Sequence, residues 1–221
     1  MRYPVTIFSV KERLGKRMFK KIAADALGLS DIGKIIEPVD YDKTDADDYV
    51  FTEDDEKIYF LIKTKADEYC FTNLALIHVD GKSATSSKRT LKRYLYSENK
   101  IEDVELETAG KIDLDIEIKF RLGNEHFSID VQKDQIEKLK DLYKALLRIS
   151  EDMRENSVLI GFADQSLEKA VTILQNTRPI DTNLEKQYNE LTNFGFTWLT
   201  SVREQYRVKD FSKVFEKYIN N

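Results

Sequence analysis

The sequence predicts an α+β fold: an antiparallel sheet domain capped by a helix and followed by an all-α helical hairpin. The clearest strand pattern runs through residues 112–121, where apolar and charged residues alternate without interruption. Such alternation is typical of a strand with one buried and one solvated face. Across residues 136–150 the apolar repeat changes to three and four residues, which indicates an amphipathic helix. Residues 151–221 contain no convincing strand, and strands followed by a closing helix favour an α+β layout.

Composition restricts the class of protein. The chain has 221 residues, 41% of them apolar, which suffices for one or two domains. Its formal net charge of −5 gives no basic field, so we expect no nucleic-acid partner. The single cysteine, Cys70, excludes an intramolecular disulfide framework and favours a reducing compartment. No apolar run approaches the ~20 residues of a membrane span. We therefore expect a cytoplasmic protein that is at most peripheral to a membrane.

The N-terminal residues 1–17 carry five basic residues against a single acid. They form either a basic arm for an anionic surface or, in the second interpretation, a poorly ordered terminus or an extension ahead of a natural start at Met18. The second interpretation is favoured because terminal segments are commonly disordered. Residues 18–29 then follow helical spacing.

Residues 40–56 are rich in Asp and Glu. An EF-hand calcium loop needs a glycine at its sharp turn, and no glycine lies between Gly33 and Gly81. We therefore expect solvated turns here, because aspartate favours turns.

Strand signals follow in close succession, with Asp80-Gly81 and Gly123-Asn124 as turns. The expected strands are 57–63, 69–71, 74–79, a polar hairpin arm within 82–96, 104–108, 112–120 and 127–131.

The remaining chain is predicted to be helical. A helix over 133–150 would cap the open end of the sheet. Another over 158–174 ends at the Pro179 break, because the residue before proline avoids helical geometry. A third begins at Leu184 and extends towards Tyr218. Two helices bury little by themselves, so their apolar stripes need the sheet domain or another subunit.

Several blocks of sequence resemble the bacterial pleckstrin-homology (PH) domain family, in particular its YvbH-like members. The blocks are 18–21, 24–31, 46–49, 68–81 (EYCFTNLALIHVDG), 88–94 (KRTLKRY), 107–115 (ETAGKIDLD) and 128–131. The resemblance implies two curved antiparallel sheets with a C-terminal helix in residues 18–150, and an oligomerisation region in 151–221. It also implies ring-like homo-oligomers, no known catalytic activity and no residue-level binding site. Residues 1–17 depart from the pattern.

The basic segment 82–93 is the best candidate for ligand binding. Its five cations stand among five hydroxyl residues, and the cations are Lys82, Lys88, Arg89, Lys92 and Arg93. Cations and hydroxyl donors together suit phosphate oxygens, for example those of an anionic lipid surface. Two alternatives remain: a solvated strand edge protected by lysine, or an edge that pairs with the acidic 40–56 segment of a neighbouring subunit.

Catalytic chemistry finds little support. Cys70, His78 and His126 lie in or next to apolar strands, and free cysteine is commonly a core residue. Their spacing fits no zinc site, and the eight glycines form no phosphate-binding loop. We therefore expect a non-enzymatic scaffold or binding module without metal or cofactor. The rival is an enzyme whose site forms between subunits from the acidic 40–56 segment.

The last helices are predicted to assemble the protein. The proposed interface consists of Leu184, Tyr188, Leu191, Phe194 and Trp198, extended by Phe211, Val214, Phe215 and Tyr218. Three apolar residues of the preceding helix, Leu159, Phe162 and Val171, would cover part of it. Because the sheet domain already has a cap in 133–150, a second subunit is the expected cover. The alternative is a hairpin that folds back on its own sheet.

Overall fold

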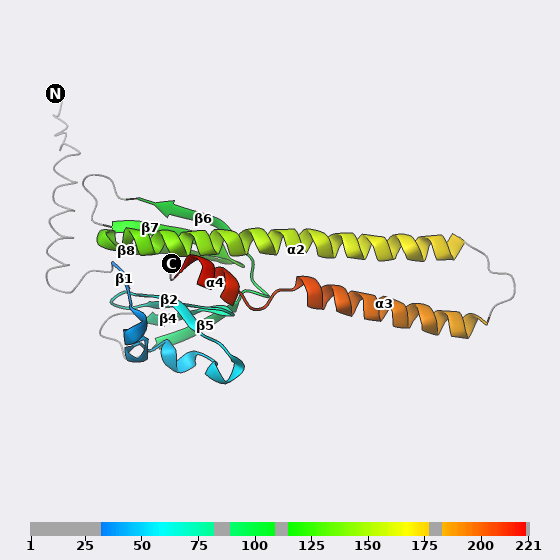
Figure 1. Ribbon diagram of the computed structural model, residues 1–221, viewed down its shortest axis with the longest axis horizontal. Coiled ribbons are helices and arrows are strands. Elements are labelled where there is room, and N and C mark those ends of the chain that lie inside the picture. Colours follow the sequence, from blue (N-terminus) through cyan, green and yellow to red (C-terminus); the bar gives the residue numbers. More distant parts are fainter. Residues whose placement is uncertain (1–31, 82–88, 109–114, 177–182, 220–221) are drawn as a thin grey trace, which may run out of the picture.

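The fold is described from a computed structural model for residues 32–81, 89–108, 115–176 and 183–219. Two antiparallel sheets, the first turns of a long helix and a short C-terminal helix form the body, from which a two-helix hairpin projects (Figure 1). The predicted helix over 18–29 lies outside the described residues. None of the described helices is both long and apolar enough to cross a membrane.

The first sheet has five strands in the order β1-β2-β3-β4-β5, and each neighbouring pair is antiparallel. The strands are β1 (Lys34–Ile35), β2 (Ile58–Lys63), β3 (Glu68–Thr72), β4 (Ala75–Gly81) and β5 (Arg89–Leu95). β5 therefore forms one edge, and it carries the described part of the basic segment.

The second sheet contains β6 (Ile101–Glu107), β7 (Asp115–Leu122) and β8 (Glu125–Gln132), again antiparallel. The predicted alternation is confirmed on β7, where every second residue from Ile116 to Leu122 is buried. Ile112 and Leu114 of that pattern lie outside the described residues. A parallel bridge between Gly33 and Val131 links the two sheets, and in the described part of the chain parallel pairing is confined to this junction.

The acidic segment folds into three short 3-10 turns, η1 (Pro38–Lys43), η2 (Asp47–Tyr49) and η3 (Thr52–Asp54). The prediction of turns is thus confirmed, but the segment also covers the outer face of the five-stranded sheet. There Ala46 and Val50 pack against Leu61, Cys70 and Ile77 in a small separate core.

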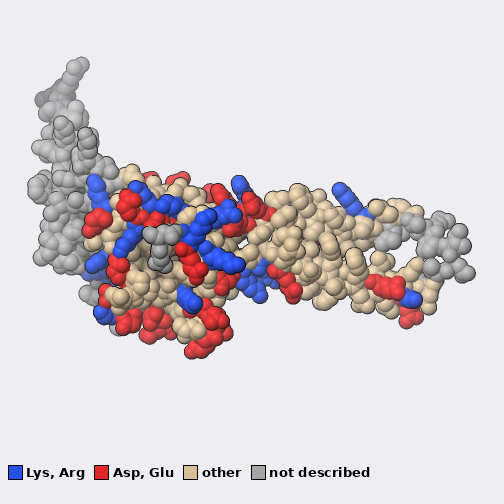
Figure 2. Space-filling view, in the orientation of Figure 1, with Lys and Arg blue, Asp and Glu red and all other residues tan. Residues whose placement is uncertain are grey.

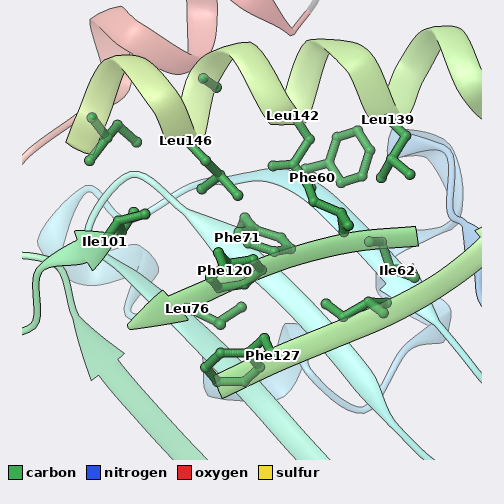
Figure 3. Packing of buried hydrophobic residues seen from close by; sticks show 14 of the residues in the cluster. Phe60, Ile62, Phe71, Leu76, Ile101, Phe120, Phe127, Leu139, Leu142 and Leu146 are labelled. Atoms are coloured by element: carbon green, nitrogen blue, oxygen red, sulfur yellow. The ribbon is translucent and has the colours of Figure 1, made fainter. Parts of the chain in front are cut away.

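The main core lies between the two sheets and the first turns of helix α2 (Ile136–Asn176), which follows the 3-10 turn η4 (Lys133–Gln135). Figure 3 shows Leu139, Leu142 and Leu146 of α2 pointing towards phenylalanines of both sheets. All three leucines are fully buried. Covering the open end of the sheets therefore removes this whole apolar stripe from water.

The predicted separation of a capping helix over 133–150 from a helix over 158–174 is wrong, because α2 is one helix of 41 residues. No proline interrupts it, and Arg148 pairs with Asp152 one turn later at 2.6 Å between Nη2 and Oδ1. The helix therefore leaves the sheet domain without a break.

The next described helix, α3 (Leu184–Tyr206), runs back beside α2 towards the sheets, and α4 (Ser212–Tyr218) ends on the core (Figure 1). We call residues 155–176 of α2 together with α3 the helical arm. Of the arm's residues whose burial the structure describes, Ala163 of α2 and Val202 of α3 are the two that are buried. The alternative of a hairpin folded back on the sheet therefore does not hold for the arm.

The predicted role of Phe211, Val214, Phe215 and Tyr218 at the subunit interface is wrong, because these residues pack into the core of their own sheet domain. The N–H of Phe211 donates to the carbonyl of Asn73 at 2.9 Å. The ring of Phe215 is fully buried and stacks on Tyr59 with centroids 5.3 Å apart. The cap formed by α2 thus leaves apolar surface that α4 fills.

We expect Phe215→Ala to destabilise the fold by about 3–5 kcal/mol, because it removes a fully buried ring from the core. The free energy of unfolding in urea measures the effect. Val39→Ala, at a side chain that is 81% exposed, serves as the control and should change little. Equal stability of both variants would contradict the assignment of α4 to the core.

Candidate functional site

The basic strand β5 presents its cations on two faces. Arg89, Lys92 and Arg93 lie on β5, opposite Gly81, His78 and Ile77 of β4 respectively. Lys82 and Lys88 lie outside the described residues. Because successive side chains of a strand point to opposite faces, Lys92 and Arg93 face different surroundings.

Arg93 is held inside the protein. Its Nη2 lies 2.8 Å from Oε1 of Glu56, whose side chain is fully buried, while that of Arg93 is 19% exposed. The hydroxyl of Thr72 also donates to this carboxylate at 2.5 Å, and the N–H of Phe51 donates at 2.8 Å. The guanidinium lies over the Phe51 ring, 4.4 Å from its centroid. Through Glu56 the acidic segment is thus fastened to two strands, to Thr72 of β3 and to Arg93 of β5.

Arg89 pairs with the same segment. Its Nε lies 3.4 Å from Oδ2 of Asp45, and its guanidinium donates to the carbonyl of Ala66. The acidic segment therefore supplies partners for two of the basic residues within one chain. No partner subunit is needed for these two pairs. Among the described residues, Lys92 is the cation of the segment that makes no ion pair.

The acidic segment is anchored by a second buried carboxylate as well. Glu68 of β3 accepts a hydrogen bond from the N–H of Ala46 at 2.8 Å, and Lys63 Nζ lies 2.5 Å from its other oxygen. The buried carboxylates of Glu56 and Glu68 thus hold the acidic segment on the outer face of the five-stranded sheet. The rival site between subunits would have to form from the remaining, exposed acids.

The cysteine and the histidines do not form a catalytic group. Cys70 pairs with Ile77 and His78 with Tyr69 across neighbouring strands, so Cys70 and His78 point to opposite faces of the sheet. Burial, reinforced by nearby Glu56, raises the pKa of the Cys70 thiol well above its ordinary value. A buried neutral thiol is a poor nucleophile. His126 is exposed at the start of β8.

His78 lies in an aromatic cluster at the inner face of the sheet. Its ring stacks on Tyr69 with centroids 4.6 Å apart and meets Phe127 in a T-shaped contact with centroids 5.9 Å apart. Burial lowers the pKa of His78, although Asp67, 3.6 Å from Nε2, and Asp80 oppose the shift. No group of three potential metal ligands gathers among the described residues.

Three shallow hollows of about 190 to 250 Å³ lie around α2 and the body. The largest lies at the base of the arm, between Tyr96, Met153 and Arg207. Neither histidine lines any of the three. Carboxylates do line them, namely Glu102, Glu98 and the pair Glu37 and Asp141.

The helical arm presents the predicted interface to solvent. Tyr188 is 69% exposed and Phe194 62%, and the ring of Phe194 stacks on Trp198 one turn later. Leu191 is also exposed, and Leu184 begins α3. The three α2 residues predicted to cover this surface are themselves exposed: Leu159, Phe162 and Val171. Sequence analysis had missed Val158, Ile173, Phe196 and Leu199, which extend the same exposed surface.

Charge is distributed unevenly over the molecule. Lysine, arginine and carboxylate side chains crowd the body, whereas the middle of the arm is almost free of them (Figure 2). Residues 156–163 of α2 and 191–202 of α3 contain no charged residue at all. This charge-free band carries Phe162, Phe194 and Phe196, so large apolar side chains are exposed where no charge interrupts them.

We expect Arg93→Ala to destabilise the fold by about 3–5 kcal/mol, because it leaves the buried Glu56 carboxylate without its cation. Lys92→Ala, on the next residue of the same strand, should change the unfolding free energy by no more than about 0.5 kcal/mol. Urea unfolding measures both. A stability of Arg93→Ala equal to that of Lys92→Ala would show that Arg93 has no structural role.

Comparison with known proteins agrees with this geometry. A family model described as "Bacterial PH domain" matches residues 26–150, and one described as "YvbH-like oligomerisation region" matches residues 161–221. The chain is 79% identical over 204 residues to "Uncharacterized protein YvbH" of Bacillus subtilis (strain 168), covering 92% of this chain and all of that protein.

The fold has a solved counterpart. The crystal structure of a PH-domain-containing bacterial protein from Exiguobacterium sibiricum 255-15 superposes with a TM-score of 0.79 and 52% identity, over 86% of this chain and all of that chain. The two sheets closed by a helix are thus a PH-like domain, and a YvbH-like oligomerisation region follows it. The chain belongs to the bacterial PH domain family.

Proposed function

We propose that the protein is a non-enzymatic scaffold that self-associates through the helical arm into a closed, ring-like homo-oligomer. The observation that carries this proposal is the exposure of large apolar side chains on the arm, led by Phe196 at 73% and Tyr188 at 69%. Fully burying one such side chain is worth about 1.5–3 kcal/mol. Several of them together therefore favour association strongly.

The body of the same chain cannot supply the cover. The outer face of its five-stranded sheet is occupied by the acidic segment, and its open end by α2 and α4. The arm also points away from the body (Figure 1). Because monomeric proteins rarely expose large contiguous apolar patches, a second copy of the chain is the best cover.

The position of Phe194 and Phe196 supports contacts on more than one side. Two residues along a helix correspond to a rotation of about 200°, so these rings project from roughly opposite flanks of α3. The helix α2 can cover only the stripe between them. A subunit with neighbours on both flanks suits a closed ring, and closed symmetry is usual for homo-oligomers.

The continuous helix α2 gives such an assembly a defined shape. Its first turns lie in the core of the PH-like domain and its last turns in the arm. Arms that pack together would therefore hold their domains at fixed positions and angles. This is the property that a scaffold requires.

We expect the double variant Phe194→Glu/Phe196→Glu to dissociate the oligomer to a mass near 25.8 kDa, because burying unpaired charge opposes association. The control is Asn193→Glu/Thr197→Glu, which adds the same charge to exposed positions of α3. Light scattering on the full-length chain measures the mass.

Two outcomes would count against self-association through the arm: a wild-type chain that is monomeric, or a phenylalanine double variant that keeps the wild-type mass. The full chain is required because removing residues 151–221 would also remove Phe215 from the core. Loss of the oligomer in such a truncation would therefore be ambiguous.

Docking on an anionic lipid surface is the alternative function, and the pairing of Arg89 and Arg93 speaks against it. We expect the oligomer to sediment no more with vesicles that contain acidic phospholipid than with neutral ones at physiological salt. Selective sedimentation with acidic vesicles that Lys92→Ala abolishes would instead support a head-group site on β5.

A further inference from the structure

Two of the hollows adjoin one another where α2 leaves the body. One, of about 230 Å³, lies between the start of β6 and α2, and the other, of about 250 Å³, lies between α2 and the connection from α3 to α4. Three residues line both of them: Lys100, Met153 and Ser157. The two hollows therefore form one groove, which we call the base groove.

The carboxylates of the base groove each have an arginine of their own. Glu102 pairs with Arg121 of β7, and Oε1 of Glu98 lies 3.5 Å from Nη2 of Arg207. The guanidinium of Arg207 also donates to the carbonyl of Ser97 at 3.1 Å. The negative charges at the groove are thus balanced by these two arginines.

Two further cations line the groove without such a balance. Lys100 precedes β6 and Arg154 lies on α2, and both line the hollow of about 230 Å³. In the described part of the chain neither makes an ion pair. The chain has a net charge of −5, and its basic strand β5 pairs both arginines internally. The base groove is therefore unusual in offering two cations without counter-ions.

A hydroxyl group lies with these cations. Nζ of Lys100 donates to Oγ of Ser157 at 3.2 Å, so the hydroxyl proton of Ser157 remains available to another acceptor. Arg154 and Ser157 are three residues apart on α2, on one side of the helix. The groove thus presents ammonium, guanidinium and hydroxyl donors from two elements. Such donors suit the oxygens of a phosphate group, through charge-assisted hydrogen bonds.

The size and the walls of the groove restrict the rest of the ligand. Ile101, Met153 and Val158 line the same hollow as the two cations, and Val158 is 49% exposed. These side chains offer apolar surface to a carbon skeleton next to the phosphate site. The hollow is smaller than the roughly 300–1,000 Å³ of pockets for drug-sized ligands, so the ligand must be small.

We propose that the base groove binds a small phosphate monoester. Lys100, Arg154 and Ser157 hold its phosphate oxygens, and its carbon skeleton lies against Met153 and Val158. Two unpaired cations favour a doubly charged phosphate over a single carboxylate. This proposal does not depend on self-association. The ester can be a soluble molecule or a lipid head group, and the experiment below distinguishes these sources.

Saturation-transfer NMR on the full-length chain, with phenyl phosphate as the probe, tests the site. We expect a dissociation constant of about 1 mM or lower at low ionic strength, weakened by added salt. Inorganic phosphate should displace the probe. Lys100→Gln/Arg154→Gln should weaken binding about tenfold or more, and Ser157→Ala by about three- to tenfold.

The matched control is Lys140→Gln/Lys144→Gln, which removes the same charge from α2 outside the groove. Both lysines form exposed ion pairs within their own helix, so their loss should change neither the fold nor the binding. Urea unfolding checks that all variants keep the stability of the wild type. Equal loss of binding in the control and in Lys100→Gln/Arg154→Gln would show only a general charge effect and overturn the site.

A wild type that does not bind phenyl phosphate at about 10 mM would also overturn the proposal, since that concentration is about ten times the expected dissociation constant. Sedimentation with vesicles that contain phosphatidic acid identifies the source of the ester. We expect the probe to bind and the vesicles not to sediment the protein, which assigns a soluble ester. Sedimentation that Lys100→Gln/Arg154→Gln abolishes would assign a lipid head group to the same groove.

Discussion

The helix α2 is the constraint on which the rest of the structure depends. Its first turns must bury Leu139, Leu142 and Leu146 against the sheets, which fixes the direction in which the helix leaves the body. Because no break follows, the remaining turns extend into solvent along that same line. The arm is therefore positioned by the packing of the PH-like domain, and not by a linker.

The return of the chain to the core is the second constraint. Asn73 of the β3–β4 turn is almost fully buried, and its amide donates to Asp210 at 2.9 Å while its carbonyl accepts from the N–H of Phe211. These bonds place α4 on the sheets, where Phe215 completes the core. Both ends of the hairpin are thus attached to one body. The arm can project only as a closed hairpin, and its apolar surface stays at a distance from its own domain.

Ion pairs within the body attach the acidic segment to the strand β5. The acidic segment and the strand β5 carry opposite charge, and these charges pair within one chain. Arg93 pairs with Glu56, and Arg89 pairs with Asp45. The buried pair of Arg93 and Glu56 holds the acidic segment in one position on the sheet, since either charge would be costly to bury without the other. In sequence the same residues look like a free anion-binding segment. Among the described cations of this segment, Lys92 is the one that makes no ion pair, while Arg89 and Arg93 pair with carboxylates.

The sequence by itself determined what depends on local periodicity. Alternation on β7 and the spacing of the leucines of α2 indicate the buried faces of these elements, because each element exposes only one face to the core. Phe194 and Trp198 of α3 were likewise found from their spacing, but Phe196 was not. What local pattern cannot decide is which partner covers an apolar stripe. Phe215 and Phe194 look alike in sequence, yet one is fully buried in the core and the other is 62% exposed. The irregular segment 207–211 and its hydrogen bonds to Asn73 separate them. In the same way, the pairing of Arg93 with Glu56 brings together residues that are 37 positions apart, and the tertiary structure alone decides such a contact.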